Sequence, residues 1–286
     1  MGGFQKVTDA TKRLAESLGV TTRCNSMVTG IREDGVLTIN TSVPTSVPTL
    51  YPADLIVVNA DLPYATKSLL VNEDSSQRPI FDWDDQFSFS SGVIAFHWSL
   101  SKTCDDLNTH NVFLVAGSRS QAVLSWETLR TSPDGTARGV SPPFNFYVHR
   151  ASPTDRSAAP PGCDSLMVLV PCRTLLRDEE CAKLSREEAL DRYQQQFPDS
   201  VISQVREAVL DRLGAIESLG DLGEWILDEV VDTPATWAEQ YHLAAGTPFA
   251  LVRGTSVFEL EDTMAIGFIG PTQRTLRIVE SHGMLL

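Results

Sequence analysis

Four polar residues that could do chemistry lie close together between two apolar segments. In "FYVHRASPTDRSAAPPGCDSLMVLVPC", residues 146–172, His149 and Arg150 end the first segment, and Asp155 and Arg156 precede the second. These residue types allow three interpretations: a reaction centre, a ligand collar, or the polar turn of a hairpin. The local residues do not choose among them, so the rest of the chain has to be considered.

Motifs that identify common kinds of active site are missing from this sequence. It contains no G-x-G-x-x-G, G-x-S-x-G, H-E-x-x-H or G-x-x-x-x-G-K-[ST], so nothing supports a hydrolase, zincin or P-loop protein. The 5 cysteines form no C-x-x-C pair, which predicts reduced core thiols and no metal site.

Two histidines are candidates for a functional role. His97 lies between Phe96 and Trp98 and either faces a pocket or is a buried histidine with its hydrogen bonds satisfied. His149 is the better candidate because it ends an apolar segment close to Asp155. Its alternative role is a hydrogen bond that orients the following loop.

Composition restricts the class of protein. The 286 residues carry a formal net charge of −14, which argues against nucleic acid as a partner, because phosphate binding depends on Lys and Arg. No apolar run approaches the roughly 20 residues needed to cross a bilayer, and the first ten residues lack the apolar region of a secretory signal. We expect an intracellular protein whose membrane contact, if any, is peripheral.

The sequence of the first third of the chain predicts a helix, a hairpin and a buried strand. Val7, Ala10, Leu14 and Leu18 recur at helical spacing before Gly19, which predicts an amphipathic helix. Asp34-Gly35 predicts a hairpin turn, and the proline-rich residues 42–50 predict a surface loop. The apolar run "LIVVN", residues 55–59, predicts a strand buried on both faces.

The rest of the sequence predicts aromatic-rich strands followed by helices. Residues 87–98 predict a strand, with "HNVFLVAG" as its sheet partner. Ser185 to Glu188 form a capping box, and Pro198 separates the helix that follows from a second one. "EWILDEVVD" predicts a strand that a break at Thr233-Pro234 separates from a short helix.

The order of several blocks resembles one family. "GGFQKVTDATKRLAESLGVTTRCNSMVTGI", "ADLIVVNADLPYA", "FSFSSGVIAFHWSL", "FYVHRASPTDRSAAPPGCDSLMVLVP" and "DTPATWAEQYHLAAGTPFAL" are similar to consecutive blocks of the bacterial and fungal phytoene desaturases, the fungal branch above all. The resemblance covers about Gly2 to Leu251. It implies an FAD-dependent oxidoreductase of carotenoid biosynthesis that acts on a hydrophobic carotenoid. It also implies contact with a peripheral membrane surface.

The resemblance assigns roles to individual residues. Val28 would offer backbone hydrogen bonds to the adenine side of FAD, and Asn59, Ala60 and Asp61 would end a strand close to the cofactor. Asp61 has the alternative role of a strand-to-helix cap. Substrate-lining residues would include Phe96, Trp98, Phe146, His149 and Met167, although the apolar ones could equally be core. No catalytic acid or base is assigned.

The expected fold is α/β, with part of a Rossmann-type FAD domain and an inserted mixed-sheet α+β substrate domain. We expect residues 1–75 and 232–286 in the FAD domain, and 76–231 in the substrate domain. Residues from about 252 onward do not match the family, and the family's glycine-rich FAD motif is missing from the start. We therefore interpret the sequence as a fragment. By itself it should neither retain FAD tightly nor desaturate phytoene.

Two other functions stay open. One is a carotenoid isomerase or an amine-oxidase-like flavoprotein, which would share the broad fold. The other is a noncatalytic lipid-binding fragment, and an oligomer is possible in each case. The sequence does not give the number of desaturation steps or the final electron acceptor.

Overall fold

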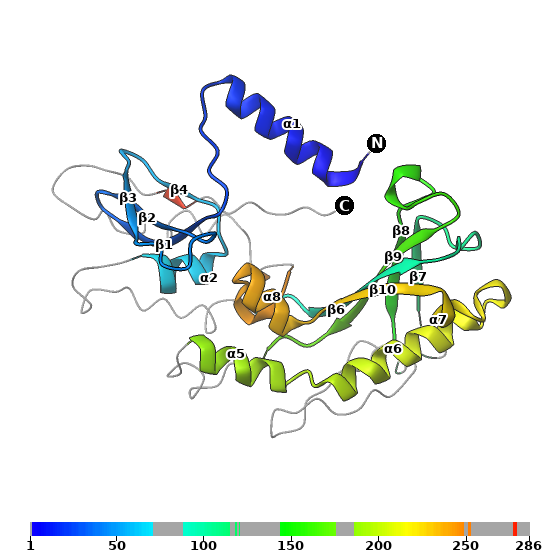
Figure 1. The fold of residues 1–286 in the computed structure, drawn as a ribbon. Coiled ribbons are helices and arrows are strands. Elements are labelled where there is room, and N and C mark those ends of the chain that lie inside the picture. The colour runs from blue at the N-terminus through cyan, green and yellow to red at the C-terminus, as the bar shows by residue number, and fades with distance from the viewer. Residues whose placement is uncertain are drawn as a thin grey trace. The chain divides into compact units, whose positions relative to one another are not determined.

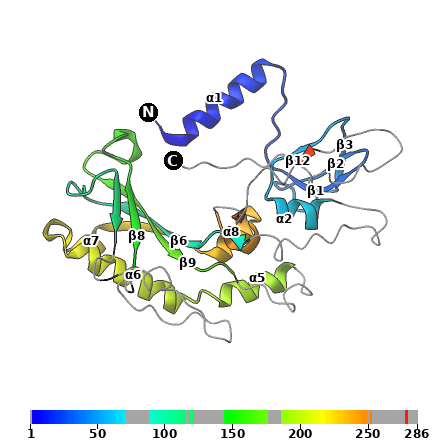
Figure 2. The ribbon, with the colours of Figure 1, turned by 180° about the vertical axis from the view of Figure 1, so that it is seen from behind.

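The structure is a computed structural model, and it describes residues 2–70, 88–114, 118, 120, 144–175, 186–248, 251–252 and 277–278 (Figures 1 and 2). The chain divides into two compact units. The first contains residues 1–11 and 90–248, and the second contains residues 12–89 and 249–286. Residues 232–248, expected in the FAD domain, therefore group with the larger unit.

A five-stranded sheet forms the centre of the first unit, in the order β10-β6-β9-β8-β7. Its strands are β6 (Gly92–Leu100), β7 (His110–Phe113), β8 (Phe146–Arg150), β9 (Asp164–Cys172) and β10 (Ile226–Asp232). Every pairing is antiparallel, so the expectation of a mixed sheet was wrong. The segment containing β7 was expected beside β6, but β7 pairs with β8, because β9 occupies the place next to β6.

Helices cover one face of this sheet (Figure 1). They are α5 (Arg186–Gln195), α6 (Asp199–Gly214), the short α7 (Leu222–Trp225) and α8 (Pro234–Tyr241). The predicted apolar side of α6 is confirmed, since Val201, Val205, Val209 and Leu213 are buried. The predicted break before α8 is also confirmed, because Thr233 and Thr236 form a reciprocal capping box with Pro234 at the first turn.

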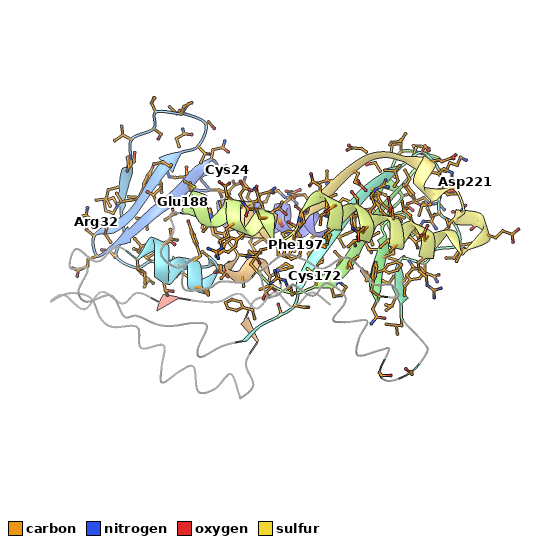
Figure 3. All side chains as sticks on the ribbon, turned by 90° about the horizontal axis from the view of Figure 1, so that it is seen from below. Cys24, Arg32, Cys172, Glu188, Phe197 and Asp221 are labelled. Atoms are coloured by element: carbon orange, nitrogen blue, oxygen red, sulfur yellow. The ribbon has the colours of Figure 1, made fainter. Side chains whose placement is uncertain are left out.

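Strand alternation explains why the core lies on the helical face. In β8 and β9 every second residue is buried, and these residues join Phe96 and Trp98 of β6 and the apolar side of α6 in one core. Cys172 at the end of β9 and Phe197 between α5 and α6 belong to this core (Figure 3). In β8 and β9, the residues that alternate with the buried ones point to the opposite face of the sheet.

The second unit contains a three-stranded antiparallel sheet, β1 (Ser26–Arg32), β2 (Gly35–Asn40) and β3 (Thr49–Pro52). The hairpin at Asp34-Gly35 is confirmed. A Cβ at Gly35 would lie 2.2 Å from the Tyr51 carbonyl oxygen, so only glycine allows this approach of β3. Strand β3 lies partly inside the segment that was predicted to be loop.

Short elements complete this unit. They are β4 (Val57–Val58), α2 (Leu62–Tyr64), a π-helical turn (Ala65–Leu69), β5 (Ser88–Phe89), β11 (Leu251–Val252) and β12 (Arg277–Ile278). β4 pairs with β12 in parallel, and β5 pairs with β11.

The strand predicted at residues 55–59 is shorter and more exposed than expected. Only Val57 and Val58 are extended in β4, and Leu55 and Val57 are 56% and 59% exposed. Val58 alone is buried, against Ile31, Ala65 and Leu69. The prediction of burial on both faces was wrong, because this small core contacts the strand from one side.

Helix α1 (Gly3–Ser17) has the predicted amphipathic pattern. None of its residues is buried. The backbone leaves the helix at Gly19, whose φ of +87° lies in the left-handed region that favours glycine.

Candidate functional site

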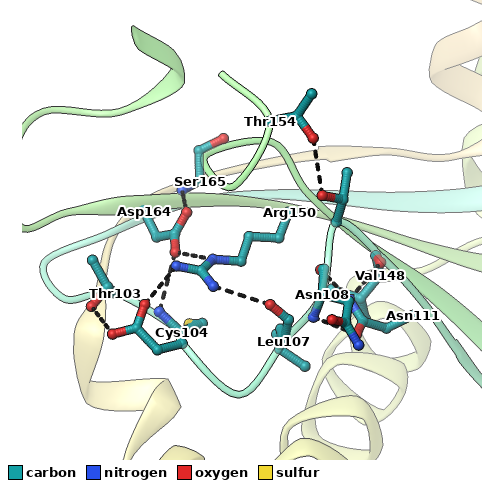
Figure 4. Close-up of polar contacts among 12 residues, drawn as sticks. Thr103, Cys104, Leu107, Asn108, Asn111, Val148, Arg150, Thr154, Asp164 and Ser165 are labelled. Atoms are coloured by element: carbon teal, nitrogen blue, oxygen red, sulfur yellow. Dashed lines mark hydrogen bonds and ion pairs between the residues drawn. The ribbon is translucent and has the colours of Figure 1, made fainter. Parts of the chain in front are cut away.

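Arg150, at the end of β8, occupies the centre of a polar cluster (Figure 4). Its Nε donates to Asp164 Oδ2 at 2.6 Å, its Nη2 to Asp105 Oδ1 at 2.8 Å, and its Nη1 to the Leu107 carbonyl at 3.0 Å. The side chain is 9% exposed, on the same face as the core. Arg150 therefore fastens the loop after β6 to strands β8 and β9.

The electrostatics of this cluster agree with a structural role. Burial alone would raise the pKa of Asp164, but hydrogen bonds from the Cys104 backbone and from Arg150 help to hold it below its ordinary value. Burial raises the pKa of the Cys104 thiol to about 12. The ion pair thus stays charged and the thiol stays protonated at neutral pH.

The polar residues of the following turn also hold the backbone. Asp155 Oδ1 accepts hydrogen bonds from the Ser157 hydroxyl at 2.6 Å and the Ser157 backbone N–H at 3.0 Å, and so caps the 3-10 turn Arg156–Ala158. Hydrogen bonds from the Ser157 hydroxyl, then from the Gly2 backbone N–H, and then from the Ser157 backbone N–H lower the pKa of Asp155. For Arg150 and Asp155, the hairpin interpretation of the sequence agrees with the structure.

His149 differs from its neighbour Arg150, because successive residues of a strand point to opposite faces. On the face away from the core, it is aligned with cross-strand partners on both sides. We call the set Val230, His97, Met167, His149 and His110, which are register partners from β10 to β7, the histidine row. These side chains are half-buried or exposed.

Aromatic and polar contacts organise one end of the histidine row. The rings of His149 and His110 are stacked with centroids 5.3 Å apart, and His110 Nδ1 lies 2.6 Å from the Tyr147 hydroxyl. Burial, followed by the proximity of His110, lowers the pKa of His149. His149 is therefore a neutral imidazole at neutral pH, beside the thioether of Met167.

Near the other end of the histidine row, His97 lies close to a carboxylate. His97 Nε2 lies 3.3 Å from Asp232 Oδ2, and the His97 side chain is 40% exposed. The central part, with Met167 and its neighbours Leu169 and Tyr147 on the same face, combines apolar contact area with few charges. Such a surface can hold an extended apolar molecule better than an anion.

The predicted substrate-lining residues divide between the two faces of the sheet. Phe96, Trp98 and Phe146 are 0%, 1% and 3% exposed and lie in the core under the helices. Trp98 donates its indole N–H to Glu229, which also accepts from Arg206 Nε at 2.8 Å. Of the predicted set, only His149 and Met167 lie in the histidine row.

Sequence reasoning missed His110, Tyr147 and Val230 as members or neighbours of this surface. Tyr147 lies in a strand whose residues alternate between buried and half-buried, whereas the sequences of β7 (HNVF) and β10 (ILDEVVD) do not alternate in polarity, so they carried no such signal. Sequence alone could not predict that these residues lie together on one face, because their cross-strand neighbours depend on the order of the strands in the sheet.

The residues predicted to contact a cofactor lie in the second unit. Val28 and Ala60 pack against one small core of Ile31, Val58, Ala65 and Leu69. The register of β1 with β2 shifts between Val28 and Gly30, and such bulges are frequent next to binding sites. The structure thus brings Val28 and Ala60 to the same core.

Asp61 and Asn59 are placed differently. Asp61 Oδ1 accepts the backbone N–H of Tyr64 at 2.9 Å, so the alternative role as a strand-to-helix cap is confirmed. Asn59 is exposed beside Val58. A cofactor contact of either residue stays a prediction.

Comparison with known proteins finds related desaturases over most of the chain. The phytoene desaturase of Neurospora crassa is 32% identical over 256 residues, which cover 87% of this chain and 39% of that protein. The phytoene desaturase of Fusarium fujikuroi is 32% identical over 260 residues, with 87% and 42% covered. An all-trans-zeta-carotene desaturase of Myxococcus xanthus is 29% identical over 255 residues, with 87% and 42% covered.

The chain spans about two fifths of the length of these curated relatives. A scan against models of protein families gives no match.

Proposed function

Since the chain belongs to the phytoene desaturase family, we propose that it supplies the substrate-binding part of an enzyme that desaturates phytoene toward lycopene. Relatives named for the desaturation of phytoene, of zeta-carotene and of diapophytoene support this reaction class. We propose that the reaction removes hydrogen from adjacent carbon atoms and belongs to carotenoid biosynthesis.

The observation that carries the proposal is the chemistry of the histidine row. Phytoene is a hydrocarbon, so it offers no group for a hydrogen bond, and binding has to rest on apolar area and shape. Met167 and Leu169 supply such area at the middle of the sheet, and the uncharged His149 beside Met167 lowers the cost of removing water. The polyene would lie across the strands along the histidine row.

FAD is the cofactor that we propose for the complete enzyme, and when bound it would accept the hydride removed from the substrate. Val28 and Ala60 are suitably placed to contact one ligand, because both pack on the same core beside an irregular strand. Asn59 follows directly in sequence after Val58, and the Asp61 carboxylate is already used by the Tyr64 N–H. We therefore propose that Val28 and Ala60 contact the cofactor from one side.

We also propose that the protein works at the periphery of a membrane. Its substrate would be dissolved in the hydrocarbon of a bilayer. Among the described residues, no helix combines the length and the apolar character needed to span one.

Substrate binding can be tested on the chain itself. Residues 1–286 are purified in mild detergent, mixed with phytoene micelles and separated by gel filtration, and the carotenoid that co-elutes is extracted and measured. We expect Met167→Glu to weaken binding about tenfold, because a carboxylate would have to lose its water against the hydrocarbon. The matched control is Leu227→Glu, which changes a 69% exposed leucine in the same sheet outside the histidine row. Equal binding by both variants would contradict the proposed site.

The reaction itself can be tested in a chimera. The region of the Neurospora crassa phytoene desaturase that aligns with this chain is replaced by this chain, and the carotenoids are extracted from cells that make phytoene. We expect products more unsaturated than phytoene, and their loss with Met167→Glu. A chimera that binds flavin but leaves phytoene unchanged would contradict the assigned substrate.

A further inference from the structure

His97 lies in β6 between two apolar members of the histidine row. Its register partner in β9 is Met167, and its register partner in β10 is Val230. The His97 side chain is 40% exposed and Val230 is 54% exposed, so this part of the row reaches solvent on the face away from the core. A polar ring is therefore accessible beside apolar contact area, which is the combination that fixes the orientation of a largely apolar ligand.

Asp232, at the end of β10, lies against the same ring. Its side chain is 13% exposed, and its Oδ2 lies 3.3 Å from His97 Nε2. The Thr236 hydroxyl, in the first turn of α8, donates to Oδ1 at 3.3 Å and helps to hold the carboxylate in place. Carboxylate oxygens present only lone pairs, so the neutral imidazole places its proton on Nε2 and its lone pair on Nδ1.

The Nδ1 atom of His97 is an acceptor that the described part of the chain leaves unused. No described residue donates to it, whereas Nδ1 of His110, at the β7 end of the row, already lies 2.6 Å from the Tyr147 hydroxyl. Because an exposed acceptor is hydrogen-bonded to water, a ligand that replaces this water keeps the stabilisation only if it brings a donor. A bare hydrocarbon has no donor, and a hydroxyl group has one.

We propose that the histidine row also binds acyclic isoprenoid chains that end in a hydroxyl group, with the O–H donating to His97 Nδ1. The chain would run from β6 across Met167 toward β8, because Asp228 and Asp232 on the β10 side would have to lose water against it. The inference rests on the proposed function, since the same surface would hold the hydrocarbon part of the ligand. It adds His97 as a specificity-determining residue, which sets the direction of a chain with one hydroxyl end.

The test compares geranylgeraniol with its methyl ether, which has the same chain but no hydroxyl donor. Residues 1–286 in mild detergent are mixed with each probe and separated by gel filtration in mildly alkaline buffer, which favours neutral imidazole. The ratio of retained alcohol to retained ether measures the preference for a donor. We expect this ratio to be about fivefold higher for the wild-type chain than for His97→Phe, which keeps an aromatic ring but loses the acceptor. Any difference between the probes in their affinity for micelles cancels, because it is the same for both proteins.

Two further measurements separate recognition by His97 from an indirect effect. Ser99→Ala is the matched control, since Ser99 is exposed two residues farther along β6 on the same face, and it should keep the wild-type ratio. Nitrogen NMR of the imidazole rings should show the Nδ1 signal of His97 moving with geranylgeraniol and not with the ether.

Circular dichroism shows whether each variant keeps its fold, and if His97→Phe does not, the NMR signal of the wild-type chain decides. An equal ratio in the wild type and in His97→Phe, a ratio that Ser99→Ala lowers as much, or an unmoved Nδ1 signal overturns the proposal.

Failure of this inference is distinguishable from failure of the proposed function. A wild-type chain that retains phytoene in the gel-filtration assay but shows no preference for the alcohol contradicts the role of His97 alone. A chain that retains neither phytoene nor either probe contradicts both proposals. Met167→Glu should lower the retention of the alcohol and of the ether alike, because both would place their chain across Met167.

Discussion

Arg150 and Asp164 make a residue-scale prediction about stability toward acid. The folded pKa of Asp164 is below the ordinary value of about 3.9, so its contribution to the unfolding free energy is complete above that value and is lost as the pH falls through the lower folded pKa. Asp164→Asn should remove this dependence and lower stability at neutral pH by about 3 kcal/mol, because Arg150 would keep its charge without its closest partner.

Urea unfolding at a series of pH values between neutrality and acid checks this expectation. Asp228→Asn removes an exposed carboxylate of the same sheet and serves as the control. Equal acid sensitivity of wild type and Asp164→Asn would show that the cluster contributes little to stability.

His149 supports a second prediction at the same scale. Its pKa is lowered by burial and then by His110, so it should titrate below the ordinary value of about 6.5. His110→Gln removes the neighbouring charge and should raise the pKa of His149 part of the way back, since burial remains. Proton NMR of the imidazole signals measures this, and His97→Gln is the control because Met167 separates His97 from His149 in the histidine row. An unchanged His149 pKa in His110→Gln would contradict the coupling.

The same residues show what sequence could and could not give. The pattern of residues 146–172 correctly predicted two strands joined by a polar turn, because alternation and proline content are local properties. The pattern could not predict that Arg150 points to the core and that His149 points away from the core. The face that becomes the core depends on where α6 packs, and that is a long-range property.

At the scale of elements, α8 begins with a capping box that the structure allows us to test. Thr233 accepts from the Thr236 N–H, and Thr236 accepts from the Thr233 N–H. Thr233→Ala should lower the unfolding free energy by about 1 kcal/mol, because a backbone N–H of the first turn loses its acceptor. Thermal or urea unfolding measures the loss, with Thr22→Ala at an exposed position outside the helices and strands as control. An unchanged midpoint would show that solvent replaces the cap.

Elements that depend on local sequence signals were predicted well, whereas the pairing of strands with one another was not. The Asp34-Gly35 turn, the apolar side of α6 and the break before α8 follow from glycine, helical spacing and Thr-Pro, and all were confirmed. The partner of β7 and the short, one-sided burial of β4 depend on distant segments. Phe96, Trp98 and Phe146 illustrate the same limit, since aromatic content alone cannot distinguish a core from a pocket.

At the scale of the whole molecule, the two compact units differ greatly in what holds them together. In the first unit, five strands and the helices between 186 and 241 enclose one core that contains buried residues from every strand except β7 and β10, whose residues pack at its margin. In the second unit, the described core consists of Ile31, Val58, Ala65 and Leu69. Because stability grows with the apolar surface that a fold removes from water, the two units should differ in autonomy.

We therefore predict that residues 90–248 fold alone, whereas residues 12–89 do not. The first fragment contains every strand of the five-stranded sheet together with α5 to α8, so cutting it out breaks none of the pairings in that sheet. The second loses β11 and β12, which pair with β5 and β4, and retains few buried apolar side chains. Circular dichroism and urea unfolding of both fragments give the answer. Residues 90–248 should unfold in one cooperative transition, and residues 12–89 should show none. A cooperative transition in residues 12–89, or its absence in residues 90–248, would mean that the units depend on each other in a way that their separate cores do not reveal.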